Sequence, residues 1–232
     1  MVAEQSVPSA TDSAEVTGSA GLSVTEIYAS IQGESTHAGR PCSFVRLARC
    51  PLRCTWCDTV YSFATGEAMS IADVVAKVVE LGVPLVEITG GEPLAQKACG
   101  PLVAALCDAG HELLMETSGA FSWAEIDPRC KIIADLKCPG SGESDRNLLP
   151  ALQQLRAVDE LKIVVADRQD FDWALAVLAE QLAGLAATIL WSPVHPSCRP
   201  HELAAWIMQT RAPGRLQLQL HKVLWPEAEA GV

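Results

Sequence analysis

Three cysteines are packed into one short segment of this chain, Cys50-Pro-Leu-Arg-Cys54-Thr-Trp-Cys57. The segment follows an apolar, β-branched run, so its CxxxCxxC spacing predicts a tight loop at the carboxyl end of a strand. Three thiolates on such a loop can each bind one iron of a [4Fe-4S] cubane, and the fourth iron keeps an open position for a chelating ligand. The segment therefore predicts an iron-sulfur site held by Cys50, Cys54 and Cys57.

A structural zinc site is the alternative reading of this loop. A closed zinc site needs four ligands, usually as two separated pairs, and the sequence contains no second CxxC and no HxxxH. Cys42 is the further thiolate that such a site would use. Unligated packing is the second alternative, and it is the default for the other six cysteines, which are scattered in apolar company: Cys42, Cys99, Cys107, Cys130, Cys138 and Cys198.

Charge and composition exclude several classes of protein. A formal net charge of -11 argues against broad nucleic-acid binding, which draws its affinity from clustered Lys and Arg. No apolar stretch reaches the length of a membrane span, and the start of the chain has no secretory pattern. An odd count of 9 cysteines is a poor disulfide framework and suits a reducing compartment. We therefore expect a cytoplasmic protein that binds neither nucleic acid nor membrane.

The elements that must position the cysteine loop follow from the apolar pattern. Residues 1–20 are rich in Ser, Ala, Thr and Glu, which predicts a disordered extension, and a single domain is expected over 21–232, with structure starting near Ser23. Strands are predicted over 43–48, 85–89, 113–116, 131–135, 160–165, 188–192 and 216–219, and helices over 71–81, 101–109, 170–182 and 200–210.

The alternation of strands and helices predicts an α/β fold with a mainly parallel sheet. Right-handed crossovers place the chemistry at the carboxyl ends of such strands, where the cysteine loop falls. Six or seven strands are too few for a closed eightfold barrel, so we expect an incomplete, TIM-like barrel. The sequence shows no internal repeat.

A second motif, Ile88-Thr89-Gly90-Gly91-Glu92-Pro93, closes another predicted strand. Alone it could be an ordinary turn, because glycine permits positive φ and proline starts loops. Together with the cysteine loop it resembles the radical S-adenosylmethionine (SAM) superfamily. The resemblance implies that the open iron binds the amine and carboxylate of SAM, and that this glycine-rich turn contacts the methionine amino group.

Further segments are similar to the 7-carboxy-7-deazaguanine synthase family over nearly all of residues 24–225. The resemblance implies a lyase that contracts the ring of 6-carboxy-5,6,7,8-tetrahydropterin to 7-carboxy-7-deazaguanine with loss of ammonia, on the route to queuosine and other 7-deazapurines. The cluster would cleave SAM to a 5'-deoxyadenosyl radical that abstracts hydrogen from the pterin, with SAM regenerated and Mg2+ assisting. The matching segments are Ser30-Ile31-Gln32-Gly33-Glu34, Phe44-Val45-Arg46-Leu47, Cys57-Asp58-Thr59, Glu116-Thr117-Ser118-Gly119 and His221-Lys222.

The resemblance also implies roles for individual residues of this chain. Thr59 would bind Mg2+. The SAM contacts would be Trp56, Cys57, Asp58, Gly91, Glu92, Ser118, Asp135 and Lys137. The substrate contacts would be Ile31, Gln32, Gly33, Glu34, Arg46, Thr89, Glu116 and His221. The chain departs from the family's usual pattern at Ser35, where glycine is common, and at Leu136, where a Ser-Pro-Lys pattern is frequent.

Three of these residues also have a chemical rationale of their own. Arg46 lies four residues before Cys50, and a guanidinium binds a substrate carboxylate through two parallel hydrogen bonds; the alternative is a solvated surface charge. Thr59 offers the hard oxygen that Mg2+ prefers, or it caps a turn. Glu116 can accept hydrogen bonds from an amino-pyrimidinone edge, or it is a solvated strand end.

Partners follow from the resemblance as well: a flavodoxin- or ferredoxin-type electron donor and a second copy of the chain in a homodimer. Two rival functions stay open at this point. One is a glycyl-radical activating enzyme, which shares the cysteine loop but acts on a protein. The other is a zinc-stabilised binding module without catalysis, which metal analysis would distinguish.

Overall fold

The computed structural model describes residues 21–228 and 230–231; the expected extension over 1–20 lies outside them. The described strands form one nine-stranded sheet in the order β3-β1-β2-β4-β5-β6-β7-β8-β9. β1 is antiparallel to β2 and β3, and all pairings from β2 to β9 are parallel. The strands are β1 Leu22–Ile31, β2 Pro41–Leu47, β3 Glu67–Met69, β4 Leu85–Gly90, β5 Glu112–Thr117, β6 Lys131–Lys137, β7 Glu160–Val165, β8 Thr188–Pro193 and β9 Arg215–Leu216.

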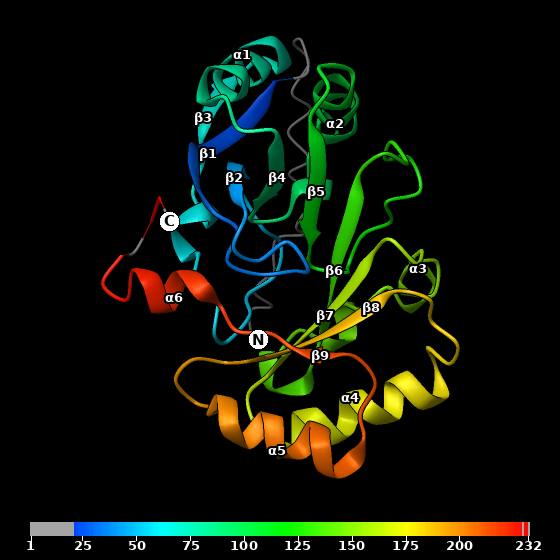
Figure 1. The fold of residues 1–232 in the computed structure, drawn as a ribbon. Helices are drawn as coiled ribbons and strands as arrows, with labels where there is room; N and C mark the ends of the chain where they lie inside the picture. Colours follow the sequence, from blue (N-terminus) through cyan, green and yellow to red (C-terminus); the bar gives the residue numbers. More distant parts are fainter. Residues whose placement is uncertain (1–20, 229, 232) are drawn as a thin grey trace, which may run out of the picture.

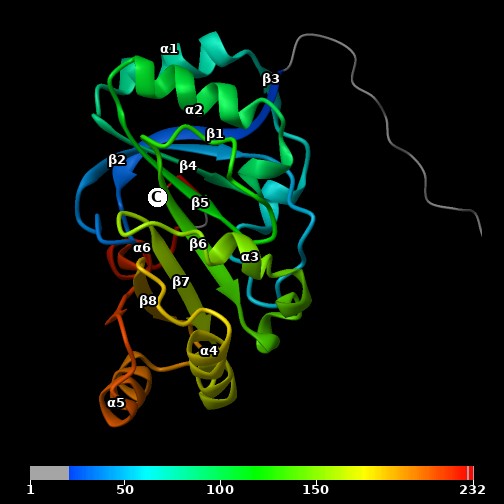
Figure 2. The same ribbon diagram turned by 90° about the vertical axis from the view of Figure 1, so that its right-hand side faces the viewer.

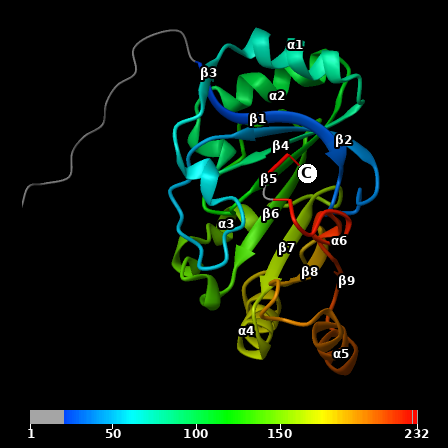
Figure 3. The same ribbon diagram turned by 90° about the vertical axis from the view of Figure 1, so that its left-hand side faces the viewer.

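The sheet curls, and most helices cover its outer side (Figures 1 and 2). Two of them, α1 and α2, lie over the first half of the sheet, and α4 and α5 lie over the second half. Figure 3 shows the opposite side of the molecule, with α6 close to the ends of β7 and β8. The helices are α1 Ile71–Leu81, α2 Cys99–Asp108, α3 Leu149–Leu152, α4 Arg168–Glu180, α5 Pro200–Thr210 and α6 Leu220–Leu224.

Capping residues set the ends of the long helices. The Ser70 hydroxyl accepts a hydrogen bond from the backbone N–H of Asp73 at 3.1 Å and so begins α1. Gly82 ends the same helix at a φ of 68°, a left-handed conformation that suits a residue without a Cβ. The Asp167 carboxylate begins α4 by accepting from two backbone N–H groups.

The core has two parts that leave the carboxyl ends of the strands free for chemistry. The larger part fills the space between the sheet and the outer helices. The smaller part is a plug of Cys42, Phe44, Leu85, Leu114 and Ile133, which come from four neighbouring strands, with Tyr28 packed against it. It lies toward the amino ends of these strands. We call it the apolar plug.

The expected fold is confirmed: the sheet is mainly parallel and remains open, with β3 and β9 as its edges. The helices predicted over 71–81 and 200–210 have those bounds. The expected count of six or seven strands was wrong for the described residues, because the β1 and β3 strands were not predicted. The predicted strand over 216–219 is also wrong in extent, since β9 ends at Leu216. No helix among the described residues is long and apolar enough to cross a bilayer.

Candidate active site

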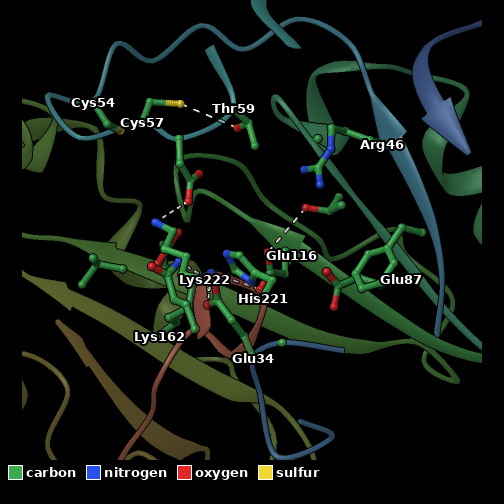
Figure 4. Close-up of a pocket in the computed structure, with 18 of the residues that line it drawn as sticks. Glu34, Arg46, Cys54, Cys57, Thr59, Glu87, Glu116, Lys162, His221 and Lys222 are labelled. Atoms are coloured by element: carbon green, nitrogen blue, oxygen red, sulfur yellow. Dashed lines mark hydrogen bonds and ion pairs between the residues drawn. The ribbon is translucent and has the colours of Figure 1, made fainter. Parts of the chain in front are cut away.

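The three loop cysteines line one cavity of about 460 Å³ at the carboxyl ends of the strands. Their thiols are free and half-buried, whereas the other six cysteines are free and buried. Burial raises the pKa of the Cys50 and Cys54 thiols, the Lys137 ammonium opposes that rise, and each thiol is affected by the charge of Cys57. The three thiols are therefore near enough to interact electrostatically, and Figure 4 shows Cys54 and Cys57 on the same loop.

This arrangement suits a cluster and not a single ion. No group of three His, Cys, Asp or Glu side chains within the described ranges is placed to hold one metal ion. A cubane does not require such convergence, because each thiolate binds a different iron. Cys42, the fourth ligand of the zinc alternative, is fully buried in the apolar plug and does not line the cavity.

The cysteine loop and the glycine-rich turn are bonded directly to each other. The backbone N–H of Gly91 donates to the carbonyl of Leu47 at 2.8 Å, and the N–H of Glu92 donates to the carbonyl of Arg49 at 2.8 Å. A Cβ on Gly91 would overlap that Arg49 carbonyl, so only glycine permits the approach. The two motifs, far apart in sequence, form one platform along the cavity.

Glu92 is placed differently from its expected role as a SAM contact. Its side chain is fully buried and does not line the cavity. The carboxylate accepts from the Thr117 hydroxyl at 2.9 Å and from the Ser118 N–H at 2.8 Å. Glu92 therefore holds the end of β5 in place. Ser118, which is bonded to Glu92, lines the cavity, whereas Glu92 does not.

Asp135 and Lys137 lie at the carboxyl end of β6, and both line the cavity together with the cysteines. The Lys137 ammonium contacts the Asp135 Oδ2 at 2.7 Å. Burial lowers the pKa of Lys137, but the charge of Asp135 outweighs it and the pKa is raised, so the ammonium keeps its proton. The other oxygen, Asp135 Oδ1, is buried without a hydrogen-bond partner among the described residues. A buried polar atom without a partner is rare and marks a place where a ligand can donate.

Arg46 is not a surface charge, because only 11% of its side chain is exposed. It lies on β2 opposite Thr89 of β4 and projects into the cavity that Glu116 also lines (Figure 4). Its Nε donates to Glu26 at 2.7 Å and its Nη2 donates to the Tyr28 hydroxyl at 2.9 Å. Nη1 makes no hydrogen bond to the described residues, so the far end of the guanidinium can meet an anion.

A second wall of the cavity is formed where the segment after β1 meets a buried lysine on β7. The sequence reasoning missed this lysine. Lys162 of β7 lies 3.0 Å from both Glu34 and Glu116. Gln217 and Gln219 also donate to the Glu34 carboxylate, at 3.0 and 2.8 Å. Glu116 is therefore not a solvated strand end. Ile31, Gln32, Gly33, Glu34, Thr89 and Glu116, all expected substrate contacts, line the same cavity.

Glu87 is the second charged residue that the sequence reasoning missed. It is 2% exposed and lines the cavity from β4, where Gln32 Nε2 donates to its Oε2. For both Glu87 and Lys162 a signal exists in the sequence: each interrupts an apolar strand, as Val86-Glu87-Ile88 and Leu161-Lys162-Ile163. A charged group inside a buried strand needs a partner, which indicates a site.

The C-terminal segment closes the remaining side, and its helix α6 was not predicted. His221 lines the cavity next to Gly33, and burial lowers the pKa of its imidazole. Lys222 lies 2.9 Å from Asp58 in the cysteine loop. Burial alone would raise the pKa of Asp58, but the Lys222 ammonium outweighs it and holds the pKa below its usual range. Trp225, Pro226, Ala228 and Ala230 also line the cavity.

Thr59 faces the cavity two residues after the last cluster cysteine. It precedes the 3-10 helix Val60–Phe63, but its side chain makes no capping bond there. The hydroxyl lies 3.7 Å from the Cys57 sulfur, its one hydrogen-bonding neighbour among the described residues. Trp56, the remaining expected SAM contact, lines the cavity as well.

Comparison with known proteins identifies the class of enzyme to which this site belongs. Residues 45–139 match the family model described as the Radical SAM superfamily, and this stretch holds both the cysteine loop and the glycine-rich turn. With an open α/β barrel and three free thiols at its strand ends, the chain is a radical SAM enzyme, a class that uses a [4Fe-4S] cluster and SAM.

Relatives define the family within this class. The chain is 42% identical over 215 residues to the 7-carboxy-7-deazaguanine synthase of Chlorobaculum tepidum, covering 91% of this chain and 97% of that protein. It is 38% identical over 226 residues to the synthase of Koribacter versatilis, covering 91% and 100%. This chain belongs to the 7-carboxy-7-deazaguanine synthase family. The crystal structure of QueE from Escherichia coli shares the fold, with a TM-score of 0.72, 24% identity and coverage of 86% and 94%.

The family relationship decides against both rival functions. Neither rival function accounts for the similarity to the synthases, which runs over 91% of the chain. The expected family is therefore confirmed.

Proposed function

We propose that this protein converts 6-carboxy-5,6,7,8-tetrahydropterin to 7-carboxy-7-deazaguanine with release of ammonia, on the route to queuosine and related 7-deazapurines. The observation that carries the proposal is the cavity itself. It is lined by three free thiols and by Arg46, Glu34 and Glu116, within a chain related to named synthases over almost its full length. A carboxylated pterin offers an anion to Arg46 and N–H groups to Glu34 and Glu116.

The cofactor end of the cavity fits the groups that a radical SAM enzyme uses. Cys50, Cys54 and Cys57 would hold the cluster, which when reduced supplies the electron that cleaves SAM. Lys137 would pair with the methionine carboxylate, and Asp135 Oδ1, buried without a partner in the described structure, would accept from the bound cofactor. Trp56, Gly91 and Ser118 would complete this surface, with Glu92 acting through Ser118.

The substrate end would bind the pterin by charge and hydrogen bonding. Arg46 would pair with the carboxylate through its free Nη1 and the outer hydrogen of Nη2. Glu34 and Glu116 would accept from the amino-pyrimidinone edge, oriented by Lys162. Ile31, Gln32, Gly33, Thr89 and His221 would surround the ring, and the neutral His221 imidazole would add no charge.

Four further features belong to this proposal. Thr59 would place its hydroxyl on Mg2+, with substrate oxygens and water completing the octahedron, because Mg2+ prefers hard oxygen ligands. A flavodoxin- or ferredoxin-type protein would reduce the cluster. A homodimer is the expected assembly. A reducing cytoplasm would suit nine cysteines that are all free.

Mass analysis tests the reaction. The protein is reconstituted with iron and sulfide under anaerobic conditions and incubated with SAM, a reductant and the carboxytetrahydropterin. A product lighter than the substrate by one ammonia supports the proposal. Omission of SAM and omission of reductant are the controls, and each should prevent the product. SAM cleavage without any change in the pterin would refute the proposed substrate while leaving the enzyme class intact.

A further inference from the structure

Glu87 is a buried carboxyl on the cavity wall to which the proposed reaction assigns no role. On β4 the side chains alternate, so Val86 and Ile88 enter the core while Glu87 faces the cavity. Gln32 donates to Oε2, and no other hydrogen bond from the described residues reaches the carboxyl. Glu87 is paired across the sheet with Phe44 of the apolar plug. The carboxyl therefore sits between an apolar floor and the space for the ligand.

The charges around Glu87 are unequally distributed. Lys162 on β7 is bonded to Glu116 on β5 and to Glu34 in the segment after β1, each at 3.0 Å, but it makes no hydrogen bond to Glu87. The other titratable groups that act on Glu87 or feel its charge are Cys42 on β2 and Tyr28 on β1, and neither is a cation. Lys162 thus stabilises negative charge on Glu116 and Glu34 by direct contact, whereas it acts on Glu87 through its charge alone.

We propose that the Glu87 carboxyl donates its O–H to a carbonyl oxygen of the bound pterin, while the neighbouring Glu116 carboxylate accepts from the ring N–H groups. Burial raises the pKa of Glu87 well above its usual value, the charge of Glu116 raises it further, and the charge of Lys162 opposes the rise only in part. Burial also raises the pKa of Glu116, but Lys162 opposes that rise. Of two carboxyls that cannot both ionise freely, the one that makes no direct contact with the cation keeps the proton.

This assignment rests on the proposed function and adds a basis for substrate specificity. An amino-pyrimidinone edge carries N–H and NH2 donors next to a carbonyl acceptor. A wall with ionised acceptors alone would repel that carbonyl oxygen. One neutral acid among the acceptors supplies the missing donor, and Gln32 fixes its orientation. Glu87 is therefore a specificity-determining residue in this chain.

Infrared difference spectroscopy tests the proton directly, without relying on turnover. The protein should show the carbonyl stretch of a protonated carboxyl at neutral pH, and this band should be missing in Glu87→Gln. Addition of the carboxytetrahydropterin, with SAM bound, should shift the band, because a new hydrogen bond forms. In Gln32→Leu the band should persist, since that variant removes the Gln32 contact and leaves the carboxyl. A missing band in the wild type, or a band that the pterin does not move, would overturn the assignment.

Steady-state kinetics give the second readout. Glu87→Leu should raise KM for the pterin about tenfold, the effect of one lost hydrogen bond to a buried carbonyl, with a smaller change in kcat. Glu87→Gln should recover most of that loss, because its amide NH2 also donates. A loss in Glu87→Gln as large as in Glu87→Leu would contradict the donor role of Glu87. Failure of the proposed reaction is separable: the band would shift with the pterin, but the wild type would form no product.

Discussion

Replacement of Arg46 by alanine should lower the specificity constant for the carboxytetrahydropterin by at least two decades without loss of the cluster. The guanidinium is 11% exposed, and the site offers the substrate carboxylate no second arginine among the residues that line the cavity. Removing one partner of a buried charge pair costs about 3 to 5 kcal/mol, and each 1.4 kcal/mol is about tenfold. The expected loss is therefore roughly two to three and a half decades.

The structure shows that part of this loss belongs to the protein and not to the substrate. Arg46→Ala also leaves Glu26, 19% exposed, with the Tyr61 hydroxyl, at 2.9 Å, as its one hydrogen-bond donor among the described residues. The double variant Arg46→Ala with Glu26→Gln removes that orphaned charge. Its loss in specificity constant therefore reports the missing contact with the substrate carboxylate. Arg46→Lys should recover only part of the activity, because an ammonium cannot form two parallel hydrogen bonds.

The assay is steady-state turnover at equal iron loading for the wild type, Arg46→Lys, Arg46→Ala and the double variant, with unfolding measured in parallel. If the double variant equals the wild type in specificity constant, Arg46 only balances Glu26 and the carboxylate is bound elsewhere. If all four proteins are alike, the reasoning from burial is wrong as a whole.

Three further predictions follow from the site. Single alanine variants of Cys50, Cys54 and Cys57 should lose the brown absorbance and all SAM cleavage. The controls Cys99→Ala and Cys107→Ala, at buried positions away from the cavity, should keep both. An intact cluster in Cys54→Ala would contradict the assignment. Thr59→Ala should reduce the stimulation by Mg2+ more than it reduces iron content, and turnover that is indifferent to Mg2+ after chelation would remove that role from Thr59. Because the pKa of Glu87 is raised in the folded state, its contribution to stability is complete below the usual value of 4.5 and is lost as the pH rises through the raised pKa. Denaturant titrations from pH 4 upward should therefore show wild-type stability falling relative to Glu87→Gln, and parallel curves would contradict the burial of a protonated acid.

Much of the site was predictable because its motifs are local and follow strands. The cysteine loop and the glycine-rich turn each occupy a few consecutive residues, and parallel strands bring their carboxyl ends to one edge. Arg46 was expected to face the site for the same reason. Its partner Glu26 was not, because strand β1 was not predicted as a strand and its pairing register was unknown.

The rest depends on tertiary packing that a local pattern does not contain. Glu87 and Lys162 sit in apolar strands, and nothing in their own segments says that they reach one cavity from β4 and β7. Glu92 shows the converse, since its motif predicted a ligand contact but its carboxylate is used by Thr117 and Ser118. Helix α6 has neither a side-chain cap nor a buried face, as Val223 at 66% exposure illustrates, so its sequence carried no helix signal.

The attachment of α6 has a consequence for how the protein is made. Leu220 donates its backbone N–H to the carbonyl of Gly33 at 3.0 Å, and Lys222 pairs with Asp58, so the segment after β9 is fastened to both the pterin wall and the cysteine loop. During synthesis on the ribosome all nine strands emerge before this segment does. A nascent chain can thus assemble its sheet and present its three thiols to iron-sulfur delivery while the cavity is still open on one side, and the segment after β9 then encloses a site that already exists.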